Sequence, residues 1–261
     1  MLALLGTLVA TSGCSWDETK RLGLPEAASD RAPIIYDVWV GFWIGAAIVG
    51  ALVWGLIAWV SMRYRRKSDD EVPPQTRYNL PLEILYTAAP FIVILVLFFH
   101  TVTSQNEVNE IGDAEHEVRV EAQKWSWSFN YLDEGVYEVG TPAEPADLWL
   151  PVDEVVGFLL ESSDVNHSFW VPEFYFKQDV FPGVNENYFE VTPDREGVFR
   201  GRCAELCGMY HSRMIFDVRI VPRDEYEAHI EDLRAAGQIG DPRGASYDNN
   251  IPGLADEEEE E

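Results

Sequence analysis

Twelve residues in the C-terminal third of the sequence concentrate side chains that bind soft metal ions. Cys203, Cys207, His211 and Met214 lie within the segment CAELCGMYHSRM, and His167 lies upstream within DVNHSFW. Thiolate and thioether sulfur favour copper, and imidazole also suits it. Two cysteines, two histidines and a methionine are too many for one copper, but they suffice for two copper ions bridged by both sulfurs. The pattern therefore predicts a dinuclear copper site.

Three other interpretations of these residues remain open from the residue types alone. Cys203 and Cys207 could form a disulfide in a domain outside the cell. A zinc site with two cysteines and two histidines would leave Met214 unused, and its ligand pairs are normally more closely spaced. The side chains could also simply pack in a core.

An aromatic segment precedes this cluster. The residues from Lys124 to Tyr131 read KWSWSFNY, so aromatic side chains alternate with small polar ones. A period of two is typical of a β-strand and places Trp125, Trp127, Phe129 and Tyr131 on one face. Most of these rings are expected to pack in a core.

Two apolar stretches near the N-terminus must hold the chain in a membrane. Val38–Met62 contains no charged residue, and Ile84–Ser104 is similarly apolar. Each is longer than the roughly 20 residues that cross the hydrocarbon layer. The linker between them is basic, which places it in the cytoplasm and both termini outside. The sequence thus predicts a two-pass hairpin at residues 34–104, with helices at about 38–62 and 84–104.

The first residues resemble a secretion signal. Met1–Gly13 is apolar and rich in small residues, and it ends at Thr11-Ser12-Gly13-Cys14. This arrangement predicts a leader over residues 1–14 and a lipid attached to Cys14, which would become the mature N-terminus.

The rest of the chain is acidic and has the pattern of a β-domain. The sequence has 45 acidic and 19 basic residues, a net charge of −26, and nearly all of the excess follows Gln105. Such a surface repels phosphate, which excludes a nucleic-acid partner and favours a positively charged protein. Short β-type runs separated by turns predict a Greek-key domain over residues 105–235. A short helix capped by Asp224 is expected to follow, with the apolar residues Tyr226, Ile230 and Leu233 at i, i+4 and i+7. An acidic tail at 236–261 ends the sequence.

These features together resemble subunit II of cytochrome c oxidase. The likeness runs from about Ile34 to Leu233 and includes the hairpin, the aromatic strand, the upstream histidine and the Cys-x3-Cys-x3-His-x2-Met loop. The family implies a membrane-anchored, cupredoxin-like Greek-key β-barrel that holds the dinuclear CuA centre. The metal ligands that it implies are His167, Cys203, Cys207, His211, Met214 and the backbone carbonyl of Glu205. The resemblance implies no open coordination position, so the site would move electrons.

The same resemblance implies roles for three further residues. Trp125 would receive electrons beneath a docking site for cytochrome c, although Ser126 stands where many relatives have an aromatic residue. The Glu205 side chain would help to hold Mg²⁺ against subunit I, although a solvated carboxylate is the simpler interpretation. Glu83 would lie at the cytoplasmic mouth of a proton path, although the helix dipole also explains a glutamate there. Asp133–Glu154 is longer than in compact relatives and is expected either to contact a partner or to replace the docking surface of a soluble carrier.

The function implied is an electron-accepting subunit in the cell membrane, with its C-terminal domain on the outer face. It would take electrons from a c-type cytochrome, soluble or tethered, and pass them to haem in subunit I. Oxygen reduction and proton pumping would occur there, and subunit III and membrane lipid would be further partners. The alternatives are a CuA subunit of a nitric oxide reductase and a membrane-anchored copper-delivery module.

Overall fold

The structure is a computed structural model, and it describes residues 15–68, 72, 74–184 and 187–242. The predicted leader, the predicted lipid site at Cys14 and the end of the acidic tail lie outside the described residues. Ile34–Val108 forms one compact unit, and the described residues before and after it form the other. Each unit is described by itself.

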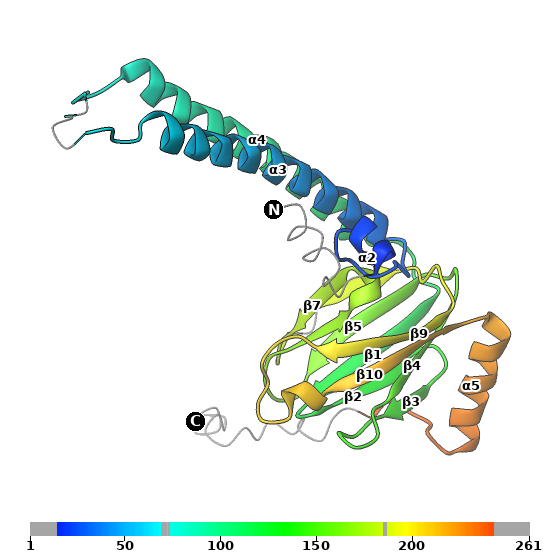
Figure 1. The fold of residues 1–261 in the computed structure, drawn as a ribbon. Coiled ribbons are helices and arrows are strands. Elements are labelled where there is room, and N and C mark those ends of the chain that lie inside the picture. Colours follow the sequence, from blue (N-terminus) through cyan, green and yellow to red (C-terminus); the bar gives the residue numbers. More distant parts are fainter. Residues whose placement is uncertain (1–14, 69–71, 73, 185–186, 243–261) are drawn as a thin grey trace, which may run out of the picture. The chain divides into compact units, whose positions relative to one another are not determined.

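The first unit is a pair of long helices, α3 (Ala32–Arg63) and α4 (Leu80–Val108) (Figure 1). Both are long and apolar enough to cross a membrane. They extend beyond the apolar stretches of the sequence, because helical backbone hydrogen bonds do not require apolar side chains at the helix ends. Most of their large apolar side chains are exposed in the isolated chain, as expected of helices that face lipid or other membrane subunits.

The second unit is built on two five-stranded sheets that pack face to face (Figure 1). The first sheet has the order β3-β2-β1-β5-β8 and the second has the order β4-β10-β9-β6-β7. The strands of the first sheet are β1 (His116–Gln123), β2 (Ser126–Tyr131), β3 (Val136–Val139), β5 (Val156–Ser162) and β8 (Tyr188–Val191). Those of the second are β4 (Asp147–Pro151), β6 (His167–Val171), β7 (Phe176–Val180), β9 (Gly197–Cys203) and β10 (Ile215–Val221).

Aromatic rings fill the space between the two sheets. Trp127 of β2 meets Phe216 of β10 edge-on at 5.3 Å, and Phe158 of β5 lies 5.8 Å from Phe169 of β6. All four side chains are buried. Inward-facing residues of both sheets thus form one core, as expected for a β-sandwich.

A short N-terminal segment belongs to this β-domain. It contains α2 (Trp16–Lys20) and then runs beside the loop that follows β8. Ala28 and Ser29 are fully buried, and the Arg195 guanidinium donates to the carbonyl groups of Glu26 and Ala27. The segment that precedes α3 is therefore attached to the β-domain.

The predicted fold class is confirmed, and two details differ from expectation. The segment from Lys124 to Tyr131 is not a single strand, because Lys124 and Trp125 form the turn between the antiparallel strands β1 and β2. The expected place of Trp125 on the strand face of Trp127, Phe129 and Tyr131 is therefore wrong. The segment Asp133–Glu154 supplies β3 and β4, and β4 pairs in parallel with β10. Leu148 and Leu150 of β4 are fully buried. The acidic and proline-rich surroundings of this short strand hid its alternation in the sequence.

Helix α5 (Arg223–Ala235) packs against β3 and β4. Its buried residues Tyr226, Ile230 and Leu233 are those that the helical period predicted. The predicted cap is wrong, because Pro222 occupies the N-cap position and Asp224 lies in the first turn. Proline suits a helix start because its fixed φ fits there and its missing N–H is not needed.

Candidate metal centre

The predicted ligands meet at one end of two central strands of the second sheet, β6 and β9. His167 is the first residue of β6, Cys203 is the last residue of β9, and Phe169 pairs with Cys203 across these antiparallel strands. The loop after Cys203 contains a short 3-10 helix, η2 (His211–Arg213), and returns to β10 directly after Met214. Strand pairing therefore brings His167 to a loop that begins 36 positions later in the chain.

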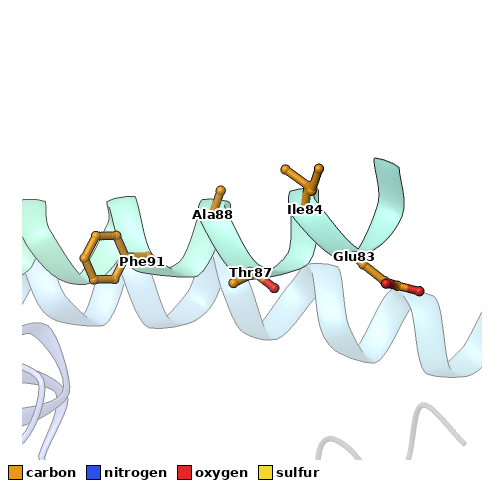
Figure 2. A pocket seen from close by; sticks show the side chains of 5 residues that line it. All are labelled: Glu83, Ile84, Thr87, Ala88 and Phe91. Atoms are coloured by element: carbon orange, nitrogen blue, oxygen red, sulfur yellow. The ribbon is translucent and has the colours of Figure 1, made fainter. Parts of the chain in front are cut away.

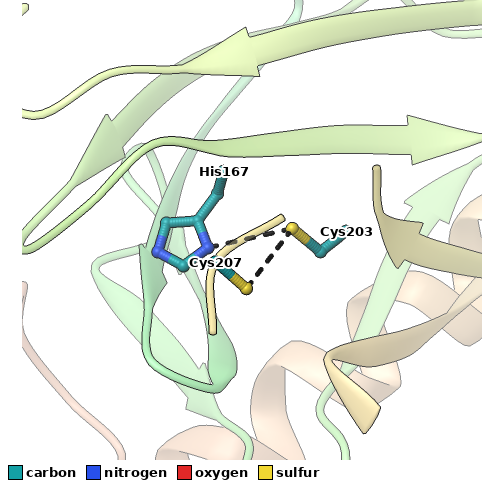
Figure 3. Close-up of side chains that lie close together, drawn as sticks. All are labelled: His167, Cys203 and Cys207. Carbon is teal, nitrogen blue, oxygen red and sulfur yellow. Dashed lines mark hydrogen bonds between the residues drawn. The ribbon is translucent and has the colours of Figure 1, made fainter. Parts of the chain in front are cut away.

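The donor atoms form a compact cluster around the two cysteine sulfurs, and Figure 3 shows His167, Cys203 and Cys207 at its centre. The Sγ atoms of Cys203 and Cys207 are 3.9 Å apart, and Cys203 Sγ is 3.8 Å from His167 Nδ1. Cys207 Sγ lies 3.6 Å from His211 Nδ1 and 3.7 Å from Met214 Sδ. The carbonyl oxygen of Glu205 is 3.2 Å from Cys203 Sγ. All six predicted donor groups thus surround the same small volume.

The centre is shielded from solvent, and its two thiols are free. His167 and Met214 are fully buried, and both cysteines are almost fully buried. Burial raises the pKa of the Cys203 thiol, but hydrogen bonds with His167 and the nearby backbone bring its pKa to about 7. Burial and the neighbouring Cys203 charge raise the pKa of Cys207. One thiol therefore loses its proton readily, and metal binding requires thiolates.

Asp164 orients His167, a role that sequence reasoning missed. Its Oδ1 atom lies 2.8 Å from His167 Nε2, and its Oδ2 atom accepts the backbone N–H of Lys124. A carboxylate on one imidazole nitrogen directs the other nitrogen toward a metal. The spacing Asp164-x-x-His167 was visible in the sequence, but only the turn before β6 shows that the two side chains meet.

Trp125 contacts the ligand loop directly. It lies in the turn between β1 and β2, and its indole N–H donates to the carbonyl of Cys207 at 3.2 Å. Its ring meets Tyr210 edge-on at 4.9 Å. Gly208 has a φ of +125°, and a Cβ atom there would lie 3.1 Å from the indole. The glycine therefore allows both the loop conformation and the close approach of the tryptophan.

These donors fit copper better than zinc. Sulfur from cysteine and methionine, together with imidazole, is the set that copper prefers. Met214 Sδ lies against Cys207 Sγ inside the cluster, whereas a zinc site of two cysteines and two histidines would not use it.

Comparison with known proteins supports this assignment. Residues 143–221 match the family described as cytochrome C oxidase subunit II, periplasmic domain. A probable cytochrome c oxidase subunit 2 of Streptomyces avermitilis is 41% identical over 276 residues, which cover 90% of this chain and 86% of the relative. The chain belongs to the cytochrome c oxidase subunit II family. It is thus a subunit of a haem–copper oxidase, which is an oxidoreductase.

Other relatives extend the comparison. Cytochrome c oxidase subunit 2 of Mycobacterium tuberculosis is 34% identical over 291 residues, which cover 88% of this chain and 80% of the relative. The crystal structure of the periplasmic domain of subunit II of cytochrome oxidase of Bradyrhizobium japonicum is 26% identical. The match covers 49% of the present chain and 99% of the chain in the crystal structure, with a TM-score of 0.45. Membership of the subunit II family implies a copper centre, and the two apolar helices fit a membrane protein with an extracytoplasmic domain.

The remaining predicted site residues lie elsewhere. The Glu205 side chain is exposed on the ligand loop. Glu83 lies in the other unit, where its carboxylate accepts the backbone N–H of Asn79 at the start of α4. It lines a pocket with Ile84, Thr87, Ala88 and Phe91 (Figure 2). The contact with Asn79 shows that Glu83 helps to begin the helix.

A second histidine cluster, which the sequence did not reveal, lies at the start of β1. His116 Nδ1 is 3.1 Å from Glu134 Oε1, and His116 Nε2 is 2.7 Å from Glu154 Oε2. The Tyr226 hydroxyl donates to Glu134, and Arg223 binds Glu154. The hydrogen bonds with Glu134 and Glu154 raise the pKa of His116 despite its burial. This cluster joins helix α5 to the β-domain.

Proposed function

We propose that this chain is the electron-accepting subunit of a cytochrome c oxidase, with a dinuclear copper centre held by His167, Cys203, Glu205, Cys207, His211 and Met214. The observation that carries the proposal is the convergence of two thiols, two imidazoles and a thioether around one volume. When bound, the copper pair supplies a one-electron acceptor and donor. Family membership favours the oxidase over a nitric oxide reductase or a copper-delivery module.

The protein around the centre restrains its ligands. Cys203 and His167 belong to paired strands, and Asp164 fixes the imidazole of His167. Met214 is fully buried, and its carbonyl accepts the indole N–H of Trp127 at 3.4 Å. Ligands held in this way change position little when charge is added or removed, which favours rapid electron transfer over substrate binding.

Electrons enter through Trp125. Its hydrogen bond to the carbonyl of Cys207 links a half-buried ring directly to a proposed ligand. The exposed side chains of Leu206 and Tyr210 lie on the same loop and give an approaching donor an apolar contact. Trp125→Phe keeps a ring but removes the N–H, so oxidase turnover should slow under donor-limited conditions while the copper content stays unchanged. Unchanged turnover would remove Trp125 from the path.

The donor is a c-type cytochrome with a basic docking face. The chain carries a net charge of −26, most of it after Gln105, and such a field attracts positively charged proteins. Exposed charges are screened over about 8 Å at physiological salt, so electron transfer from a diffusing donor should slow as salt is added. A rate independent of salt would indicate a tethered cytochrome instead.

The accepted electrons pass to haem in subunit I, where oxygen is reduced to water and protons are pumped. We propose that Glu83 lies at the mouth of a proton path into that subunit, and that the Glu205 side chain holds Mg²⁺ against it. Subunit III and membrane lipid complete the surroundings, and a lipid on Cys14 adds an anchor. Glu83→Gln should slow proton-coupled turnover and leave copper reduction intact, whereas normal turnover would limit Glu83 to its role at the helix start.

Metal analysis and electron paramagnetic resonance of the purified full-length chain test the central proposal. Two copper ions that share one unpaired electron are expected. A single copper ion, or zinc in its place, would contradict the proposal.

A further inference from the structure

Soft donor groups in the ligand loop form a series from the surface to the interior. The Met209 side chain is 82% exposed, His211 is half-buried, Cys207 is 5% exposed and Met214 is fully buried. Met209 lies two positions from Cys207 and two from His211. It is therefore a thioether at the solvent surface, on the same short loop as the buried sulfur and imidazole ligands.

The exposure of Met209 follows from the structure of the loop. Gly208, with its positive φ, turns the chain beneath Trp125, and Tyr210 packs against the same indole ring. The residue between them is thereby directed away from the packed side chains. Because burial of a methionine side chain is favourable, an exposed methionine at a fixed loop position lacks stabilisation that burial would supply.

We propose that Met209 is a capture site for cuprous ion during loading of the metal centre. This inference rests on the proposed copper site. Thioether sulfur is a soft ligand that selects Cu(I) and carries no proton, so it can bind the ion without releasing one. His211, two positions after Met209 in the loop, has a half-buried imidazole whose Nδ1 atom lies 3.6 Å from Cys207 Sγ.

Transfer inward is a ligand exchange. The bond between copper and the Met209 sulfur breaks as a bond to the Cys207 sulfur forms, and the Cys207 thiol proton passes to solvent. Copper remains Cu(I) throughout, so the step requires no oxidant or reductant. Cys207 is the natural first internal ligand, because its sulfur contacts the donors of His211, Met214 and Cys203.

The loop offers a matched control for the alternative that Met209 is only an apolar contact for a partner protein. Leu206 is 77% exposed on the same loop and presents similar apolar surface without sulfur. Met209→Leu removes the thioether and keeps the apolar surface, whereas Leu206→Ala removes apolar surface and keeps the thioether. Because Met209 and Leu206 are both exposed, neither change disturbs the core.

The test follows copper loading of the reduced, copper-free, full-length chain in detergent. Cu(I) is supplied from a glutathione buffer, so that no protein donor is involved, and copper per chain is measured over time after rapid desalting. We expect Met209→Leu to load at least about threefold more slowly than wild type and to reach the same final copper content, because capture raises the local concentration of the ion. Leu206→Ala should load at the wild-type rate. Superimposable time courses for Met209→Leu and wild type, or equal slowing in both variants, would overturn the inference.

A second measurement isolates the capture step from the buried site. Silver ion is a probe for Cu(I) without redox chemistry, and the Cys203→Ser/Cys207→Ser chain lacks both bridging thiols. This chain should still bind silver ion, and adding Met209→Leu should weaken that binding several-fold. Equal binding with and without Met209 would overturn the inference, whereas a wild-type chain that ends with fewer than two copper ions would overturn the proposed function instead.

Discussion

The β-domain buries a histidine near each end of β1, and the two have different surroundings. His116 begins this strand, and the strand ends beside Lys124, whose N–H binds Asp164, the partner of His167. Eight residues of strand separate these points by roughly 23 Å. His116 faces a carboxylate with each ring nitrogen. His167 faces one carboxylate and one sulfur.

This difference determines what each imidazole can do. A carboxylate accepts hydrogen bonds but does not donate them, so a histidine between two carboxylates carries both protons and a positive charge. His116 is therefore a structural cation between Glu134 and Glu154. In the other cluster, Asp164 uses one nitrogen of His167 and leaves the second free to bind a metal. The same type of residue thus has two roles: His116 stabilises the fold at one end of β1, and His167 is positioned to bind a metal near the other end.

The largest expected effect is on the proposed copper centre, near the end of β1 that adjoins His167. Cys207→Ser removes the sulfur that contacts Cys203, His211 and Met214, so two copper ions can no longer be bridged by both cysteines. The paramagnetic signal of an electron shared by two copper ions should disappear, while the unfolding temperature of the metal-free chain changes little. A retained signal would show that Cys207 does not bridge.

The next effect is at the other end of the strand. His116→Gln leaves the half-buried carboxylate of Glu134 without its charged partner, whereas Glu154 keeps Arg223, and it should lower the free energy of unfolding by roughly 1–3 kcal/mol. The measurement is thermal unfolding of the detergent-purified chain, with copper content as the second reading. Copper content should stay at the wild-type value, because the cluster lies far from the metal.

His229→Gln is the matched control for this variant. His229 also lies near a carboxylate, because its Nε2 atom is 3.2 Å from Glu138, and its ring stacks on Trp149. His229 has one neighbouring carboxylate and His116 has two, so His229→Gln should lower the free energy of unfolding by less than His116→Gln does. An equal loss of stability in the two variants would refute the claim that two neighbouring carboxylates make His116 the more stabilising histidine.

A smaller effect is expected at the residue that orients His167. Asp164→Asn keeps the shape and one oxygen that can accept from the imidazole, but it removes the negative charge and replaces the acceptor of the Lys124 N–H by an amide NH2 group. Copper binding should weaken by roughly tenfold, as is typical when a residue that supports a ligand is changed. Competition with a copper chelator measures this affinity. Wild-type affinity would mean that the hydrogen bond alone orients the ring.

The smallest effect is the pH dependence of the stability that the His116 cluster contributes. The folded-state pKa of His116 is raised, so its stabilisation is complete below the unfolded pKa of about 6.5 and is lost as the pH rises through the folded value. The difference in unfolding free energy between wild type and His116→Gln should therefore shrink from pH 6 toward alkaline pH. A constant difference would show that His116 does not titrate in this range.

The same cluster limits stability in acid. Burial alone would raise the pKa of Glu134, but hydrogen bonds from His116 and Tyr226 bring it below its usual value. Its contribution is therefore present above the unfolded pKa of about 4.3 and is lost as the pH falls through the lower folded value. The cluster should therefore stabilise the fold most at pH values between the folded-state pKa of Glu134 and that of His116.

The sequence by itself identified the side chains that the structure brings together around Cys203 and Cys207, and the two helices that are long and apolar enough to cross a membrane. Four of the five donor side chains lie within 12 residues, from Cys203 to Met214, so a single loop had to bring them close together. Two uncharged stretches longer than a bilayer left few structures other than a helical hairpin. The buried positions of α5 followed from a helical period that local geometry imposes.

Only the tertiary structure decided which distant residues join these local elements. His167 reaches Cys203 because β6 pairs with β9, and Trp125 reaches Cys207 because the turn after β1 lies over the ligand loop. Strand β4 escaped prediction because its five residues gain their stability from pairing with β10 and from buried leucines. The pairing of His116 with Glu134 and Glu154 depends equally on the folded β-domain. Contacts between residues far apart in sequence depend on strand order and register, which residue types along a single chain do not specify.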